Sequence, residues 1–133
     1  CTGNRSLPVL EGVDVVAYYQ LDPGADPVHG VSSIRAYLNN YAFYFSTEEN
    51  KQVFQANPWK YAPAWGGFCA WGIAAEDIWS KGFLGPPADP ASWLIRNGVL
   101  YVFHSSVPMK EYTDDMYGNK VAGDNRWASW WGK

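Results

Sequence analysis

Apolar positions along the chain fall into short runs separated by turn residues, a pattern typical of a small protein of mixed secondary structure. The first run, residues 13–19, is too short for its periodicity to distinguish a buried strand from a turn of helix. A loop is predicted over residues 21–30, which hold two prolines and two glycines. Residues 1–11 are expected to form an irregular N-terminal arm.

Two hairpins are predicted where runs of β-branched and aromatic residues flank a short turn. Asparagine tolerates positive φ, so Asn39-Asn40 is expected to form the first two-residue turn. Asn97-Gly98 is a strong hairpin signal for the second turn. The predicted strands are residues 34–38, 41–46, 92–96 and 99–104.

A helix is predicted over residues 47–56. Ser46 and Glu49 match a capping box, in which a hydroxyl caps the helix and a glutamate follows three residues later. Val53 and Phe54 are expected to supply the contacts of this helix with the core.

The C-terminal tail, from about residue 108 to 131, is predicted to be helical in two pieces that break near Gly118. Trp127, Trp130 and Trp131 lie three and four positions apart, on one helical face. Adjacent helical residues cannot face the same way, so either Trp130 or Trp131 is expected to be exposed. The elements together predict an α+β fold, with an antiparallel sheet built from two hairpins, helices packed on one face and a C-terminal helical tail.

Length and composition fit one folded domain over residues 1–133, with its core in residues 12–131. Aromatic residues make up 17% of the 133 residues and charged residues also 17%, which excludes a disordered chain. The chain has no run of about 18 apolar residues, so no transmembrane segment is expected. The net charge of −3 argues against a nucleic-acid partner, because phosphate binding needs a basic surface.

Several segments of the chain resemble the YHS domain family, and most of all its small single-domain exported proteins. They are FYFSTEEN at 43–50, FQANP at 54–58, KYAPAWGGFCA at 60–70, GVDVVAYY at 12–19, and shorter matches at 28–30, 89–93, 98–101 and 124–127. The resemblance spans roughly residues 12–131. It implies an exported binding module that is not an enzyme, and the sequence offers no nucleophile elbow or phosphate loop from which to assign catalytic residues.

The resemblance also implies a metal ligand, with copper first and zinc second. Related modules attached to copper-transporting ATPases often carry two cysteines that are thought to bind metal. Ser46 and Asn50 occupy those two positions here, so the thiolate pair that suits Cu(I) is missing. The exported branch has its cysteine in the Gly-Gly-x-Cys-Ala segment, which is Cys69 in this chain.

His29, Cys69 and His104 are the candidate metal ligands. Their separations do not match the short spacing of zinc fingers, so a site would assemble from distant segments. The alternative is that both histidines are ordinary surface residues. A rival function is a structural or protein-interaction domain that uses an exposed aromatic patch and holds no metal.

Tyr61, Trp65, Phe68 and Trp71 gather around a Gly-Gly turn and are candidates for binding a flat or sugar-like ligand. The alternative is that these rings fill the core, because the chain has few leucine and isoleucine residues.

Cys1 has two interpretations, and both place the protein outside the cytoplasm, as a secreted or periplasmic protein. It can form a disulfide with Cys69, or it can be a lipid-anchored first residue. A disulfide would remove the thiolate, leaving histidines with carboxylates, a set that favours Cu(II) or zinc over Cu(I).

Overall fold

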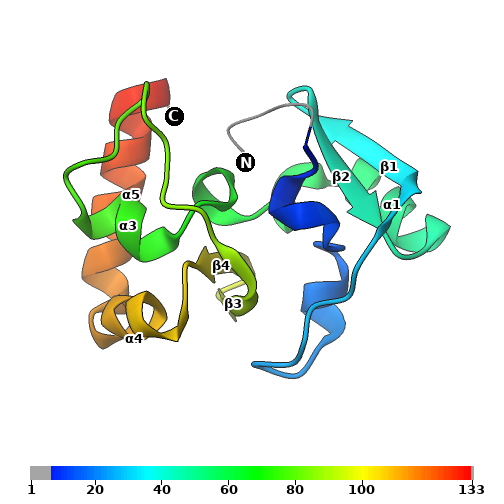
Figure 1. The fold of residues 1–133 in the computed structure, drawn as a ribbon, viewed down its shortest axis with the longest axis horizontal. Coiled ribbons are helices and arrows are strands. Elements are labelled where there is room, and N and C mark those ends of the chain that lie inside the picture. Colours follow the sequence, from blue (N-terminus) through cyan, green and yellow to red (C-terminus); the bar gives the residue numbers. More distant parts are fainter. Residues whose placement is uncertain (1–6, 133) are drawn as a thin grey trace.

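The fold combines two antiparallel hairpins with short helices and one long C-terminal helix in a computed structural model that describes residues 7–132 (Figure 1). The α+β class is therefore confirmed. In chain order the elements, with η for 3-10 helices, are η1 (Val9–Gly12), η2 (Ala17–Gln20), β1 (Val31–Leu38), β2 (Tyr41–Phe45), α1 (Glu48–Ala56), α2 (Pro58–Tyr61), η3 (Ala64–Gly67), α3 (Ala70–Ala75), β3 (Asp89–Arg96), β4 (Val99–Phe103), α4 (Ser106–Asp114) and α5 (Met116–Trp131).

Both predicted hairpin turns are confirmed. Asn39 and Asn40 have φ of 52° and 69°, and Asn97 and Gly98 have φ of 53° and 76°, as type I′ turns require. The hairpins form two separate two-stranded sheets, where the sequence had predicted one. The reason is visible in Figure 1, in which the N-terminal segment with η1 lies between the hairpins and touches both β2 and β3.

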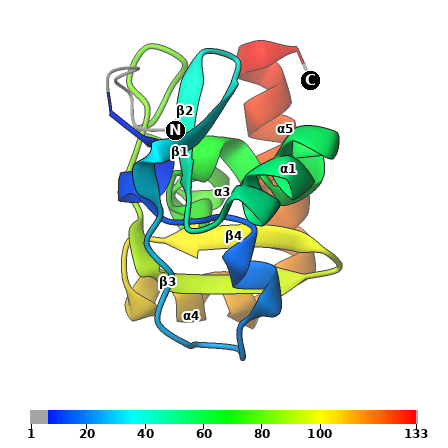
Figure 2. The ribbon, with the colours of Figure 1, turned by 90° about the vertical axis from the view of Figure 1, so that its right-hand side faces the viewer.

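The β3–β4 hairpin separates two hydrophobic clusters. Figure 2 shows the N-terminal segment in front of this hairpin and α4 behind it. Successive side chains of a strand point to opposite faces, and the burial follows that rule. Trp93, Leu100 and Val102 belong to the first cluster, with the N-terminal segment and the β1–β2 hairpin. Tyr101 and Phe103 belong to the second, with η3, α3, α4 and α5.

The predicted helix after β2 is present, but its cap is not the expected residue. The Thr47 side chain accepts a hydrogen bond from the Asn50 backbone N–H, so Thr47 is the cap. The Ser46 hydroxyl instead donates to Asp14 Oδ2. Phe54 is buried as predicted, whereas Val53 is 40% exposed and contributes little to the core.

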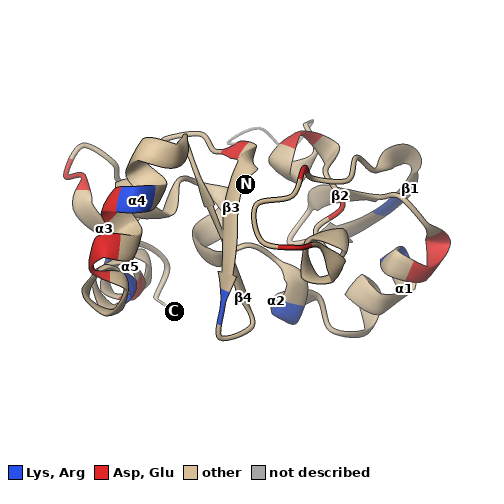
Figure 3. Cartoon of the chain, turned by 90° about the horizontal axis from the view of Figure 1, so that it is seen from below, with Lys and Arg blue, Asp and Glu red and all other residues tan. Residues whose placement is uncertain are grey.

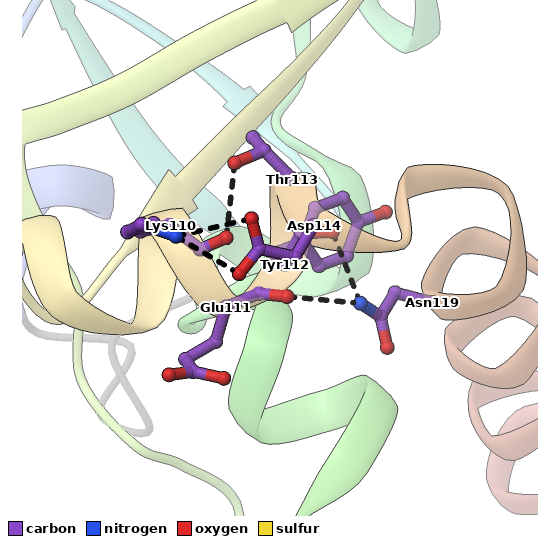
Figure 4. A network of polar contacts seen from close by, with 6 residues as sticks. All are labelled: Lys110, Glu111, Tyr112, Thr113, Asp114 and Asn119. Carbon is purple, nitrogen blue, oxygen red and sulfur yellow. Dashed lines mark hydrogen bonds and ion pairs between the residues drawn. The ribbon is translucent and has the colours of Figure 1, made fainter.

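The C-terminal tail is helical in two pieces, and the break lies at Asp115, three residues before the predicted position. The Asp115 side chain accepts a hydrogen bond from the Gly118 backbone N–H and so starts α5. Asn119 then donates to the carbonyl oxygen of Tyr112 at 3.0 Å, at the end of α4 (Figure 4). These contacts hold the two helices at a fixed junction.

Trp131 is 42% exposed while Trp130 packs against the second cluster, which confirms the expectation for this pair. No helix in residues 7–132 is both long and apolar enough to cross a membrane.

Candidate functional site

The three predicted metal ligands lie in different surroundings. Cys69 is 1% exposed within the second cluster. His104 is exposed after β4, with its Nδ1 3.0 Å from the carbonyl oxygen of Pro87. His29 is exposed and pairs with Val13 beside the first cluster. The structure therefore does not bring the three side chains together, because Cys69 faces the cluster on the other side of β3–β4 from Val13.

The predicted disulfide between Cys1 and Cys69 falls outside the described residues, since Cys1 lies before residue 7. The same holds for a lipid anchor at Cys1.

The four aromatic residues proposed as a ligand site mostly fill the core. Trp65 and Phe68 are buried in the second cluster, and Trp71 packs against it. Tyr61 instead meets Tyr19 edge-on in the first cluster, with ring centroids 5.1 Å apart. Neither of the two pockets described below is lined by any of these four residues.

Asp14 is a fully buried carboxylate that sequence reasoning did not single out. Its Oδ1 accepts from the backbone N–H groups of Val16 and Ala17 at 3.0 and 3.1 Å. Its Oδ2 accepts from the N–H and hydroxyl of Ser46 at 2.8 and 2.7 Å, and from Asn50 Nδ2 at 2.9 Å. The available signal was a lone acidic residue within the apolar run 13–19.

This network occupies Ser46 and Asn50, the two positions that the sequence resemblance aligns with cysteines of YHS modules. Ser46 and Asn50 face one another across the same Asp14 oxygen, so the two positions do converge in space. Both side chains donate to the carboxylate, and soft Cu(I) has no thiolate to bind there. These residues join the N-terminal segment to the start of α1 and do not fit a Cu(I) site.

A pocket of about 480 Å³ lies where the N-terminal segment meets the start of β3. We call it the acidic pocket, and it is lined by Glu11, Asp26, Pro27, His29, Asp89, Pro90 and Ala91. Its lining includes three carboxylates and one imidazole, which come from separate segments. Figure 3 shows the acidic start of β3 beside acidic positions of the N-terminal segment.

Backbone pairing places these side chains together. Gly30 N–H donates to the Gly12 carbonyl oxygen at 2.8 Å, and Asp14 N–H donates to Val28 at 2.8 Å, so the chain around His29 runs antiparallel to residues 11–14. On the opposite wall, a bulge between Asp89 and Trp93 interrupts the strand pairing of β3. Bulges often re-aim side chains beside binding sites.

The negative charges of the acidic pocket act on a buried tyrosine, Tyr18. The Tyr18 hydroxyl donates to the Pro90 carbonyl oxygen at 2.6 Å. Burial raises the pKa of Tyr18, and the negative charges of Asp89 and Glu11 raise this pKa further. Two carboxylates thus raise the pKa of one hydroxyl. The lining of the pocket holds three carboxylates and no lysine or arginine, which favours a cation.

A second pocket, of about 400 Å³, runs along β3 on the other side of Trp93. We call it the edge pocket, and it is lined by Tyr18, Tyr19, Leu21, Pro23, Trp93, Leu94, Ile95 and Arg96. Arg96 is its one charged residue. The indole N–H of Trp93 donates to the Ala25 carbonyl oxygen at 2.9 Å and so ties the 21–30 loop to β3 between the two pockets.

Within residues 7–132, no three His, Cys, Asp or Glu side chains stand close enough to share one metal ion. Comparisons with known proteins add no further assignment, and the resemblance to YHS domains stays a prediction. A scan against protein-family models, a search of curated proteins and a search of solved structures each found no match.

Proposed function

We propose that this protein is a non-enzymatic binding module whose acidic pocket takes a divalent transition metal, Cu(II) first and zinc second. The observation that carries the proposal is that His29, Glu11, Asp26 and Asp89 line one pocket. An imidazole with carboxylates is a donor set that suits Cu(II) and zinc. Cys69 has no part in this site, because it is buried in the second cluster.

The acidic pocket needs side-chain movement to coordinate an ion. All four donor residues are exposed, so changes of rotamer toward His29 require no repacking of the core. Coordination would bring the carboxylates of the two walls together around one charge. An extracytoplasmic location accords with this function and rests on the sequence resemblance.

Isothermal titration calorimetry with CuCl2 and ZnCl2 tests this function. The titrations use the Cys1→Ser variant, so that a terminal thiol cannot bind the metal. We expect one binding event per chain for at least one of the two metals, and His29→Ala should weaken it at least about tenfold, because it removes the nitrogen donor. His104→Ala is the matched control and should leave the affinity unchanged. Absence of heat with both metals, or equal loss in the two variants, would contradict the proposal.

The second candidate is a protein-interaction domain that uses an exposed aromatic patch. Ile78, Phe83 and Trp131 are 65%, 60% and 42% exposed at the 77–84 loop and the end of α5. Lys81 lies over the Trp131 ring at 5.1 Å, which places the 77–84 loop beside the end of α5, and Trp79 packs against Phe83 in the same loop. Exposed apolar surface of this kind favours a partner. A protein without metal affinity would make this patch the leading candidate.

A further inference from the structure

The outer edge of β3 is unpaired. β3 pairs only with β4, through a two-residue turn flanked by the pair Arg96 and Val99. That pair is hydrogen-bonded in such a hairpin, so alternate residues of β3, Trp93 and Ile95, turn their N–H and C=O groups outward. No hydrogen bond joins these outward groups to another residue within the described chain.

The opposite edge of the same hairpin is closed. Leu100 is paired across from Ile95 and also points outward, on the β4 side. The Tyr19 hydroxyl donates to the carbonyl oxygen of Gly98, just before β4, at 3.4 Å, and β4 packs against η3 and α2. The free edge therefore belongs to β3 alone, and Figure 3 shows this strand from below, between α4 and the N-terminal segment.

The edge pocket follows this free edge. Trp93, Leu94, Ile95 and Arg96 are consecutive residues whose side chains alternate between the two faces, so a pocket lined by all four runs along the strand. Leu21 and Pro23, from the 21–30 loop, also line this pocket. A second strand placed at the usual spacing of about 4.8 Å from the outer edge of β3 would lie along this pocket.

The chemistry of the edge pocket selects what can occupy it. Most of its lining is apolar or aromatic, and burial raises the pKa of Tyr19 to about 12, so this phenol is neutral at physiological pH. Arg96 is exposed and forms no ion pair with a described residue. The groove thus offers apolar contacts and one unneutralised positive charge.

We infer that an extended peptide segment of a partner protein adds to the edge of β3 as a third strand. Its backbone pairs with Trp93 and Ile95, an apolar side chain enters the edge pocket, and an acidic residue nearby meets Arg96. Addition of a strand to a free sheet edge is a known mode of peptide recognition, in which backbone bonds give affinity and pockets give specificity. The site is separate from the acidic pocket, so it does not depend on metal binding.

The bulge between Asp89 and Trp93 limits the length of the added strand. Pairing with β4 shifts register over residues 90–92, so only the stretch from Trp93 to Arg96 presents a regular edge. Two outward residues offer four backbone hydrogen bonds. The expected affinity is therefore modest, with a dissociation constant on the order of micromolar or weaker.

Selection of random heptapeptides displayed on phage against the whole protein supplies the probe. We expect enriched sequences with an apolar residue and a nearby acid. The selected peptide, synthesised and added to saturation, should slow amide hydrogen exchange at Trp93 and Ile95 at least about tenfold. The amides of Leu94 and Arg96, already bonded to β4, should change little.

N-methylation of the peptide tests whether its backbone pairs. Methyl groups on one set of alternate residues should abolish binding, and those on the other set should leave it intact, because only alternate amides face β3. Arg96→Glu should weaken binding, whereas Lys81→Glu, an equal charge change on the distant 77–84 loop, should not.

Four outcomes would overturn the inference. The first is that the selection enriches no peptide. The second is that a bound peptide leaves amide exchange at Trp93 and Ile95 unchanged. Both N-methylated series can bind equally well. Finally, a dimer of this chain can protect the same two amides without peptide, which would assign the edge to self-pairing.

Discussion

Asp14 shows how one residue joins segments that are far apart in the sequence. Its carboxylate is fully buried and forms no ion pair with a described residue. Five hydrogen-bond donors replace the counter-ion, and they belong to the 13–20 segment and to the start of α1. A buried carboxylate is tolerated when its lone pairs are occupied in this way.

Asp14→Ala should lower the free energy of unfolding by about 3 kcal/mol, because buried donors at Ser46 and Asn50 lose their acceptor. Asp14→Asn should also destabilise the protein. Its amide oxygen can accept from one group of donors, but its amide nitrogen then faces the other group and cannot accept a hydrogen bond. Urea denaturation measures both changes. Asp22→Ala, on the exposed loop, is the control and should shift the value by less than about 0.5 kcal/mol. A loss below about 1 kcal/mol for Asp14→Ala would show that the network contributes little.

At the scale of elements, the turn between β2 and α1 assigns different tasks to two neighbouring hydroxyls. Thr47 caps α1, while Ser46 holds Asp14 through both its N–H and its hydroxyl. A capping-box pattern alone would place the cap at Ser46, one residue too early. In the structure Thr47 is the cap, and the Ser46 hydroxyl is bound to the buried carboxylate.

The two hydroxyls should therefore differ in their contribution to stability. Thr47→Ala loses an exposed capping bond and should cost about 1 kcal/mol. Ser46→Ala loses a bond to a buried charged group and should cost about 2 kcal/mol. Urea denaturation of the two variants measures this difference. A greater loss of unfolding free energy for Thr47→Ala than for Ser46→Ala would refute this division of roles.

At the scale of the whole molecule, two hydrophobic clusters share one hairpin, and tyrosines lie on both sides of it. Tyr18 and Tyr19 lie on the side of the first cluster, and Tyr101 and Tyr112 are buried in the second. Burial is the largest cause that raises the pKa of each of these four phenols. Alkaline pH is therefore expected to destabilise both clusters, because each contains buried phenols that must ionise.

Stability should fall as the pH rises from about 10 to 12. The unfolded chain releases its phenol protons near pH 10, whereas Tyr19 in the folded protein releases its proton at about 12. The contribution of Tyr19 is thus fully present below pH 10 and is lost through this window. Urea midpoints measured from pH 8 to 12 check the direction, and Tyr19→Phe should flatten the curve. A midpoint that stays constant up to pH 12 would contradict the assignment.

Local patterns predicted the elements better than their assembly. Asn97-Gly98 and Asn39-Asn40 specify their turns through backbone conformation alone, so the sequence was sufficient for both hairpins. The separation of the hairpins depends on η1 lying between them, a contact between distant segments that no local pattern encodes.

Less of the candidate site than of the secondary structure was predicted from the sequence. His29 was named as a ligand, but Glu11, Asp26 and Asp89 were not, because backbone pairing between residues 12–14 and 28–30 and the β3 bulge bring them together. The edge pocket was missed for a similar reason. It depends on which strand remains unpaired, and strand pairing is a property of the completed fold.

The hydrogen bond between Tyr18 and Pro90 spans 72 residues of sequence, and this separation has a consequence during synthesis on the ribosome. The buried 13–19 segment emerges early, but the strand that covers it is made only later. At about 5–20 residues per second, the delay is roughly 4–14 s. During that interval the first cluster lacks Trp93, Leu100 and Val102, so Val13, Val15 and Val16 have only an incomplete core to enter. We therefore expect the nascent chain to expose this segment to chaperones until β3 and β4 have been translated.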